Sequence, residues 1–409
     1  MPKDLRRRLR ELGVVKGVRA LKTLPARPRV AIEDLVDGRF HTTSRGQCFI
    51  AEETYPLDHL HGGLPLSSFL SLSSETVAQI ARDDALAGLN LHRACFLDTE
   101  TTGLSRGAGT MAFMVGLGFF IEEGFRLQQY FLRDPGDEPA MIEGLTDLLP
   151  EFEALISFNG RGFDVPIIET RFILARVPPP TTGMPHLDLL SPARRLWRYH
   201  LPSRALGALE REILGVLREQ DDAPGGVIPW LYRDYVRTGD AREMQRVLYH
   251  NAVDILSLVT LTARLCQVYA DPWNEPSMNG AEFYGLARWY EADGKLVDAE
   301  RAYRAALATP LSLELRLRAL RDLAYLLKRA DRRGEAFAYW QQLALETTSA
   351  ENNVLAHVEI AKYFEWRVED LSLAARWTRA ALAQVERWPA GMGRDDVLAE
   401  LRHRLARLE

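Results

Sequence analysis

The alternation of apolar and polar positions predicts a sheet interleaved with helices in the first two thirds of the chain. Three apolar runs bounded by polar or turn-forming residues are typical of strands: ACFLD (94–98), MAFMVGLGFFI (111–121) and FRLQQYFL (125–132). A further strand is predicted at EALISFN (153–159), with helices over 138–150, from about 164, over 203–218 and over 241–268. This order of elements predicts a mixed α/β sheet flanked by helices.

From about residue 279 the pattern changes to helix pairs that repeat. Small residues recur 37 positions apart at Ala287, Ala324 and Ala361, and aromatic residues do so at Tyr303, Trp340 and Trp377. The repeat resembles the tetratricopeptide (TPR) type, whose period is about 34 residues. We therefore expect an all-α, TPR-like repeat domain over 279–409. Its role is either to bind a protein partner on a concave face or to brace the catalytic domain.

Composition indicates a soluble globular protein of two or three domains. The 409 residues are 47% hydrophobic and 26% charged, and the net charge of −5 gives no global sign of nucleic-acid binding. We expect a lead-in at 1–92, a catalytic domain at 93–272 and the repeat domain at 279–409. The apolar runs are too short to predict a membrane span. The three cysteines, Cys48, Cys95 and Cys266, are widely spaced and are typical of buried thiols in a cytoplasmic protein.

The first 30 residues are strongly basic. They contain ten Lys and Arg residues against Asp4 and Glu11. A basic N-terminal arm can follow the phosphates of a nucleic acid, and a solvated, frayed terminus has the same composition. Both interpretations stay open for this segment.

Four acids in three apolar stretches carry the chemistry. Asp98 and Glu100 lie in FLDTETTGL, Asp164 in FNGRGFDVP and Asp254 in YHNAVDILSL. Burying several carboxylates together is costly unless protons or cations neutralise them. Because the donors are all oxygens, we expect two Mg²⁺ or Mn²⁺ ions rather than zinc. The pattern therefore indicates metal-assisted hydrolysis of a phosphodiester.

The spacing within the stretches places side chains on common faces. Asp98 and Glu100 alternate on a strand, and His250 and Asp254 are four apart on a helix, so each pair shares a face. Two ions bridged by such carboxylates would activate water and stabilise the leaving oxygen, and a nearby histidine can take the proton. Taken singly, the strand pair could be a solvated strand end, and Asp164 could cap a helix.

The three stretches, in this order, resemble the motifs of the DEDD exonuclease superfamily, which has a ribonuclease-H-like fold. The wider match over most of residues 40–390, including HLDLLSPARRLW and DDAPGG, resembles its YprB-type branch. The resemblance implies four metal ligands, Asp98, Glu100, Asp164 and Asp254, and His250 as general base. It also implies that the terminal nucleotide is held by Thr101, Thr102, Gly103, Leu104, Asn159 and Phe163.

The third motif departs from the superfamily. Its His-bearing branch places the base five positions before the last Asp and its Tyr-bearing branch four, whereas here Tyr249 is five before Asp254 and His250 four before. We favour His250, because an imidazole titrates near neutral pH and a phenol does not. A histidine pair, His59 and His61, could bind metal, but a structural role is the better interpretation.

The sequence thus predicts a cytoplasmic, Mg²⁺- or Mn²⁺-dependent nuclease, a 3′→5′ exonuclease acting on single-stranded ends of DNA or RNA. Two alternatives stay open. One is a ribonuclease-H-like endonuclease, which uses the same chemistry on an internal bond. The other is a nucleic-acid-binding scaffold whose repeats recruit partners, with little catalysis. Asp188, on an apolar stretch, is expected to cap or pair rather than to bind metal.

Overall fold

The chain is described by a computed structural model over residues 28–103, 109–218, 222–389, 391 and 393–409. Most of the basic N-terminal segment, 1–27, and Leu104 lie outside the described residues. One seven-stranded sheet dominates the first half of the chain, in the order β1-β2-β7-β6-β5-β8-β9. Its strands are β1 (Gly38–Thr43), β2 (Gly46–Tyr55), β5 (Ala94–Thr101), β6 (Ala112–Ile121), β7 (Gly124–Phe131), β8 (Ala154–Ser157) and β9 (His186–Asp188).

The sheet is mixed, as predicted. Strands β5, β8 and β9 run parallel, whereas β1, β2, β7, β6 and β5 are joined by antiparallel pairing. Strands β6 and β7, both predicted as strands, form a hairpin. Strands β1 and β2 were not predicted, because β1 at the sheet edge has no buried residue and β2 is buried only in its middle. A short hairpin, β3 (Leu60–His61) with β4 (Leu64–Pro65), follows β2.

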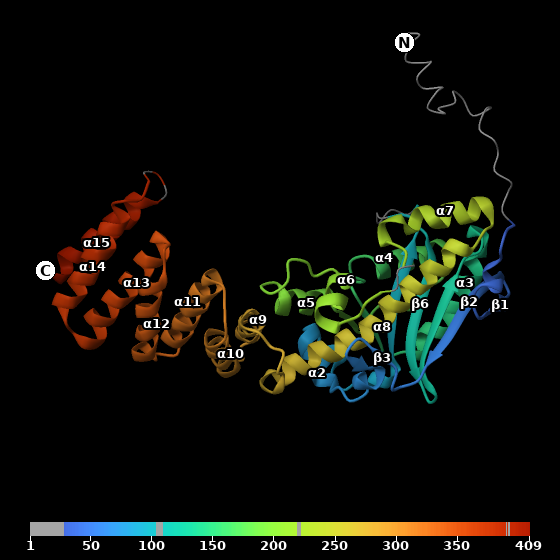
Figure 1. Cartoon of the computed structure of the whole chain (residues 1–409), viewed down its shortest axis with the longest axis horizontal. Coiled ribbons are helices and arrows are strands. Elements are labelled where there is room, and N and C mark those ends of the chain that lie inside the picture. Colours follow the sequence, from blue (N-terminus) through green and yellow to red (C-terminus); the bar gives the residue numbers. More distant parts are fainter. Residues whose placement is uncertain (1–27, 104–108, 219–221, 390, 392) are drawn as a thin grey trace, which may run out of the picture.

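Helices cover both faces of the sheet (Figure 1). Helix α8 (Arg242–Ala270) lies across β5 and β6 on one face. Residues of β5 alternate accordingly: Phe96 belongs to the core that contains α8, whereas Cys95 and Leu97 belong to a core with helices α3 (Glu138–Leu148) and α4 (Asp164–Leu174). Helix α2 (Ser74–Ala81) also contacts α8, and α7 (Ile228–Thr238) packs on α8 and β5.

One predicted helix was wrong in extent. Residues 203–218 form only the short α6 (Leu206–Leu209) and a π-helical segment (Glu210–Leu214), which ends at Gly215 with a φ of 70°. Gly215 adopts this left-handed conformation without a Cβ clash, so the chain can leave the helix and continue toward Arg218. This early ending brings Arg218 to the site described below. Helix α5 (Leu190–Trp197), which was not predicted, precedes this region.

Helix α8 is long and apolar enough to cross a membrane by length and composition. However, 83% of its most apolar 18-residue window is buried inside the protein. A helix that is apolar around most of its circumference is typical of a core as well as of a membrane span. Here the apolar side chains are covered by the sheet and by neighbouring helices. All three cysteines are free and buried.

The C-terminal part consists of helices arranged in pairs. They are α9 (Gly280–Ala292), α10 (Leu296–Ala308), α11 (Leu313–Arg329), α12 (Arg333–Glu346), α13 (Ala350–Tyr363), α14 (Leu371–Val385) and the terminal α15 (Arg394–Leu408). Ala287, Ala324 and Ala361 fall on the first helix of each pair and are fully buried. Assignment to the tetratricopeptide type, and a protein partner on these helices, stay predictions.

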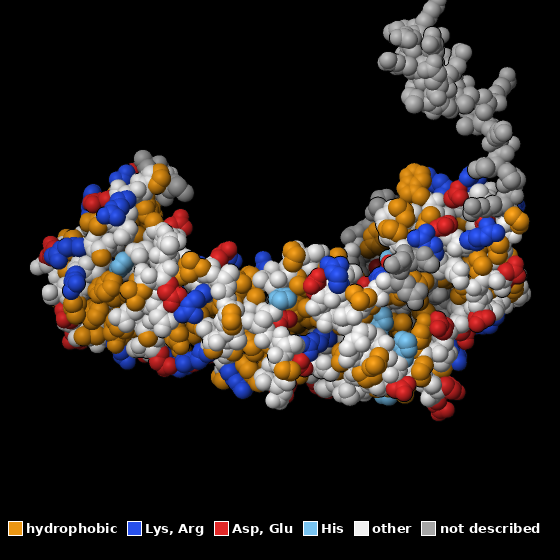
Figure 2. All heavy atoms as spheres, viewed as in Figure 1, with side chains coloured by type: hydrophobic (Ala, Val, Ile, Leu, Met, Phe, Trp, Pro, Cys, Tyr) orange, Lys and Arg blue, Asp and Glu red, His pale blue; other side chains and the backbone are white. Residues whose placement is uncertain are grey.

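The helix pairs extend from the sheet region as one elongated arm (Figure 1), and charged side chains of both signs are interspersed over its visible face (Figure 2). The first helix of the arm, α9, packs against α5. The Trp197 indole donates to Glu282 at 2.9 Å, and a Cβ on Gly285 would lie 2.2 Å from the Leu196 carbonyl oxygen. This close contact of α5 with α9 joins the two parts through one buried core. The domain boundaries near 272–279 stay a prediction.

Candidate active site

Two of the predicted acids lie at the end of strand β5. Asp98 and Glu100 share the face of the sheet that carries Phe96, which is the face covered by α8. Asp98 pairs in register with Gly116 of β6, and the register shifts between Glu100 and Thr101. Such an irregularity ends the regular pairing and redirects the chain next to a site. Both carboxylates therefore face α8 at the edge where β5 ends.

Asp164 is the first residue of α4. The residue before it, Phe163, has a φ of −139° and a ψ of −67°, and it occupies the N-cap position. Asp164 thus does not act as the N-cap, which was the alternative to a functional role. It is 5% exposed, and the Thr99 hydroxyl donates to its Oδ1 at 2.5 Å. Thr99, from the opposite face of β5, fixes the orientation of this buried carboxylate.

Helix α8 supplies Asp254 and His250. Nε2 of His250 lies 3.8 Å from Asp254 Oδ2, in agreement with the expected shared face. On its other side, Nδ1 of His250 lies 2.9 Å from Asp222 Oδ1. The imidazole is therefore held between two carboxylates.

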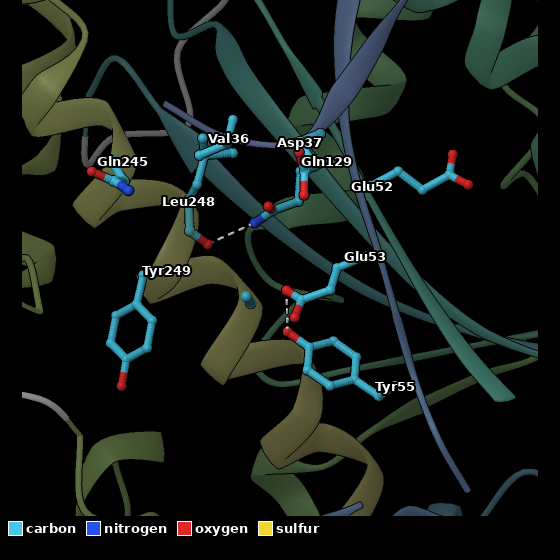
Figure 3. Close-up of a pocket in the computed structure, with 11 residues that line it drawn as sticks. Val36, Asp37, Glu52, Glu53, Tyr55, Gln129, Gln245, Leu248 and Tyr249 are labelled. Atoms are coloured by element: carbon cyan, nitrogen blue, oxygen red, sulfur yellow. Dashed lines mark hydrogen bonds between the residues drawn. The ribbon is translucent and has the colours of Figure 1, made fainter. Parts of the chain in front are cut away.

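Tyr249, the residue before His250, lines a different part of the surface of α8. It lines a groove of about 350 Å³ between α8 and strands β2 and β7, together with Tyr55, Glu53 and Gln129 (Figure 3). Because successive helical residues are turned by about 100°, a phenol in this groove cannot share the orientation of His250. Of the two alternatives for the general base, the geometry favours His250.

The neighbouring acids raise the pKa of Asp98 and Glu100. Burial raises the pKa of Asp98 well above its ordinary value, and the charges of Asp254, Asp164 and Glu100 raise it further. Burial, followed by the charges of Asp254 and Asp164, likewise raises the pKa of Glu100. Burial raises the pKa of Asp164 to about 6 against the hydrogen bond from Thr99. The carboxylates therefore lie close enough to repel one another, and a cation would relieve this repulsion.

A chain of amides supports Asp98. Nδ2 of Asn251 donates to Asp98 Oδ2 at 2.8 Å, and Nε2 of Gln129 donates to Asn251 Oδ1 at 2.8 Å and to the Leu248 carbonyl oxygen at 2.7 Å. These amides connect β5, α8 and β7 beneath the site. The contact requires Gly116 on β6, because a Cβ there would lie 2.1 Å from Asn251 Oδ1. Sequence reasoning missed Asn251 and Gln129, although glycines at 116 and 118 inside a strand signal a close approach.

Arg218 also enters the site and was not predicted. Its guanidinium pairs with Asp254, makes two hydrogen bonds of 2.7 Å to Glu210, and lies 3.3 Å from Asp222. Burial lowers the pKa of Arg218, but the hydrogen bonds to Glu210 and the charge of Asp254 outweigh it and raise the pKa overall. Burial raises the pKa of Asp254, and the charges of His250 and Arg218 lower it. Arg218 thus supplies one positive charge to the acid cluster.

The residues expected to hold a nucleotide border the cluster. The Thr101 hydroxyl donates to the Gly103 carbonyl oxygen at 2.7 Å, and the Thr102 hydroxyl accepts from the Met111 amide at 3.0 Å. These bonds order the chain that leaves β5. Asn159 is exposed at the end of β8 with a φ of 65°, and Phe163 is half-buried. Their contact with a nucleotide stays a prediction.

Two other predicted roles are structural. The carboxylate of Asp188 accepts the backbone amides of Asn159, Arg161 and Leu190 at 2.8, 3.1 and 3.0 Å, so it caps the loop after β8, as expected. Nε2 of His61 lies 2.8 Å from the Ser257 hydroxyl in a buried contact, which agrees with a structural role.

The donor set of the four carboxylates fits divalent cations in kind. Asp98, Glu100, Asp164 and Asp254 offer oxygens only, and their mutual repulsion favours a cation. Within the part of the chain that the structure describes, however, no three His, Cys, Asp or Glu side chains already surround a common ion position. Asp254 is paired with Arg218. That divalent cations are held by these four residues stays a prediction.

Comparison with known proteins agrees with this site. Residues 95–266, from the start of β5 to near the end of α8, match the RNase_H superfamily. Over 347 residues the chain is 31% identical to the protein named "Uncharacterized protein YprB" of Bacillus subtilis (strain 168), and the match covers 82% of this chain and 80% of that protein. The chain belongs to the YprB family.

The match of residues 95–266 to the RNase_H superfamily indicates a nuclease, a hydrolase that acts on phosphodiester bonds of a nucleic acid. Nucleases of this fold generally use divalent metal ions, which agrees with the oxygen-only donor set of the site. The matched segment contains all four acids as well as Asn251 and Arg218. The match to the nuclease superfamily therefore covers the part of the sheet that carries the candidate site.

Proposed function

We propose that the protein is a metal-dependent 3′→5′ exonuclease that hydrolyses single-stranded nucleic-acid ends by a two-metal-ion mechanism. The observation that carries the proposal is the set of four acids around the end of β5, in which Asp254 and Asp164 raise the pKa of both Asp98 and Glu100. Arg218 supplies only one positive charge to these four acids, so divalent cations would relieve the remaining repulsion. The 3′→5′ direction and the single-stranded end rest on the resemblance of the three motifs to the DEDD superfamily.

Each residue of the site has a separate role in the proposed mechanism. When bound, divalent cations supply charge neutralisation at the phosphate and lower the pKa of the attacking water. Asp98, Glu100, Asp164 and Asp254 would hold them. His250 would accept the proton of the water at Nε2, and Asp222, which lies 2.9 Å from Nδ1, would orient the imidazole and stabilise its protonated form. Asn251 keeps Asp98 in place with a 2.8 Å hydrogen bond.

Digestion of 5′-labelled single-stranded DNA and RNA tests the proposal. We expect a ladder that shortens from the 3′ end with Mg²⁺ or Mn²⁺, and no cleavage with EDTA or with Asp98→Asn. A substrate with a blocked 3′ end should be protected. Cleavage of the blocked substrate at internal positions would instead favour the endonuclease. Lack of metal-dependent cleavage of every substrate would refute catalysis and leave the scaffold.

A further inference from the structure

Arg218 lies where a cation of the proposed mechanism would bind. Its side chain is 17% exposed and that of Asp254 is 15% exposed, so solvent screens the pair only weakly. A guanidinium and a divalent ion would repel each other strongly at the few ångströms that separate two partners of one carboxylate. Asp254 therefore cannot serve both cations fully at once.

The position of Arg218 is built into the fold. Glu210, which accepts both 2.7 Å hydrogen bonds, is 1% exposed and also accepts the Ser257 hydroxyl at 2.8 Å. That hydroxyl in turn lies 2.8 Å from His61 Nε2. Glu210 thus anchors the guanidinium through Nε and Nη2 from behind the site; Nη2 also contacts Asp254, and Nη1 lies beside His250 and Asp222. Such an anchor can retain Arg218 after the contact with Asp254 is lost.

Arg218 also affects the tautomer of His250. Nδ1 of His250 lies 2.9 Å from an Arg218 nitrogen and 2.9 Å from Asp222 Oδ1. A ring nitrogen of a neutral imidazole either accepts or donates, so the two contacts exclude each other as hydrogen bonds. A bond from Arg218 makes Nδ1 the acceptor and leaves the proton on Nε2. A bond to Asp222 leaves the Nε2 lone pair available to take a proton from water.

We propose that Arg218 is a resident counter-ion that pairs with Asp254 and His250 in the cation-free protein and is displaced from both when a divalent ion binds Asp254. Displacement lets Nδ1 of His250 donate to Asp222, so that Nε2 becomes the acceptor that a general base requires. Arg218 is a positioning residue in this scheme, held by Glu210 in both states. The inference rests on the proposed function, because it assumes that Asp254 binds the ion.

Arg218→Gln tests the competition. Mn²⁺ binding, measured by titration calorimetry without nucleic acid, should become about ten-fold tighter, because the ion no longer displaces a guanidinium. In EDTA the same variant should melt at a lower temperature than the wild type, since the acid cluster has lost its counter-ion. Arg218→Lys retains the charge without the two-pronged contact, so its Mn²⁺ affinity and its melting temperature should lie between those of the wild type and of Arg218→Gln.

Arg171→Gln is the matched control, because Arg171 pairs with Glu138 of α3 at 2.5 Å. It should lower the melting temperature and leave Mn²⁺ affinity unchanged.

The tautomer is measured separately on the unmodified protein. In ¹⁵N-histidine-labelled protein, the His250 signals, assigned with His250→Asn, should shift from protonated Nε2 to protonated Nδ1 when Mg²⁺ is added. If Arg218→Gln binds Mn²⁺ as tightly as the wild type or more weakly, or if Mg²⁺ does not change the tautomer, the displacement of Arg218 is refuted and the proposed metal site is not. Failure of both wild type and Arg218→Gln to bind Mn²⁺ would overturn the metal site itself.

Discussion

Gly116→Ala tests how closely α8 must approach the sheet for the site to form. A Cβ at this position would lie 2.1 Å from Asn251 Oδ1 and 2.5 Å from Ile255 Cδ1, whereas ordinary contacts begin at 3.4 Å. Helix α8 would have to retreat by about 1 Å, and overpacking of this kind costs about 1–3 kcal/mol. The same shift strains the hydrogen bonds from Gln129 to Asn251 and from Asn251 to Asp98, each worth about 1 kcal/mol.

We therefore expect Gly116→Ala to lower the free energy of unfolding by about 3 kcal/mol, measured by urea denaturation in EDTA. Its nuclease rate with Mg²⁺ should fall by about a hundred-fold, because a shift of 1 Å in a catalytic group has effects of this size.

Gly118→Ala is the matched control on the same strand and face. Its Cβ would lie 2.5 Å from Ile255 Cγ2 and 2.5 Å from Phe125 Cζ, so it also overpacks the interface with α8, but Asn251 is not among its nearest contacts. We expect a similar loss of stability with a much smaller loss of rate. Wild-type stability and rate in Gly116→Ala, or equal losses of rate in the two variants, would refute the argument that the amide chain positions Asp98.

Three further predictions follow from the site and the core. Asp98→Asn should abolish cleavage and raise the melting temperature in EDTA, because it removes one member of a repelling buried cluster. His250→Ala should lower the rate but spare Mn²⁺ binding, and Tyr249→Phe should change the rate little. His61 and His186 are buried with pKa values lowered by burial to about 4, so they fold as neutral groups. Each should contribute stability that is present above pH 6.5 and is lost as the pH falls to about 4, about 3 kcal/mol in urea denaturation.

Each of these predictions has an outcome that contradicts it. A sharp drop in the melting temperature of Asp98→Asn would show that the acid is structural. A larger rate loss in Tyr249→Phe than in His250→Ala would assign the base to the phenol. For the pH dependence, His61→Gln removes one titrating group, so a wild-type pH slope in this variant would show that His61 does not titrate as proposed.

The order of strands and helices around the site was predictable from sequence, because buried strands leave continuous apolar runs. Strands β5, β6, β7 and β8 carry such runs and were placed correctly. Strands β1 and β2 were missed, since an edge strand need not bury a full face and so leaves a weak pattern. The helix predicted over 203–218 was wrong in extent, because its apolar residues pack in the four-residue helix α6 and in a π-helical segment.

The acids and their order could be read from the chain alone, since a carboxylate within an apolar run is conspicuous and alternation on β5 or a four-residue step on α8 sets its face. How these acids are neutralised and supported depends on the packing of the folded protein. Arg218 and Glu210 reach the site from a loop and a π-helical segment, and Gln129 reaches it from β7, with no local pattern that marks them. Their roles depend on distances between segments far apart in the chain, which follow from packing and not from periodicity.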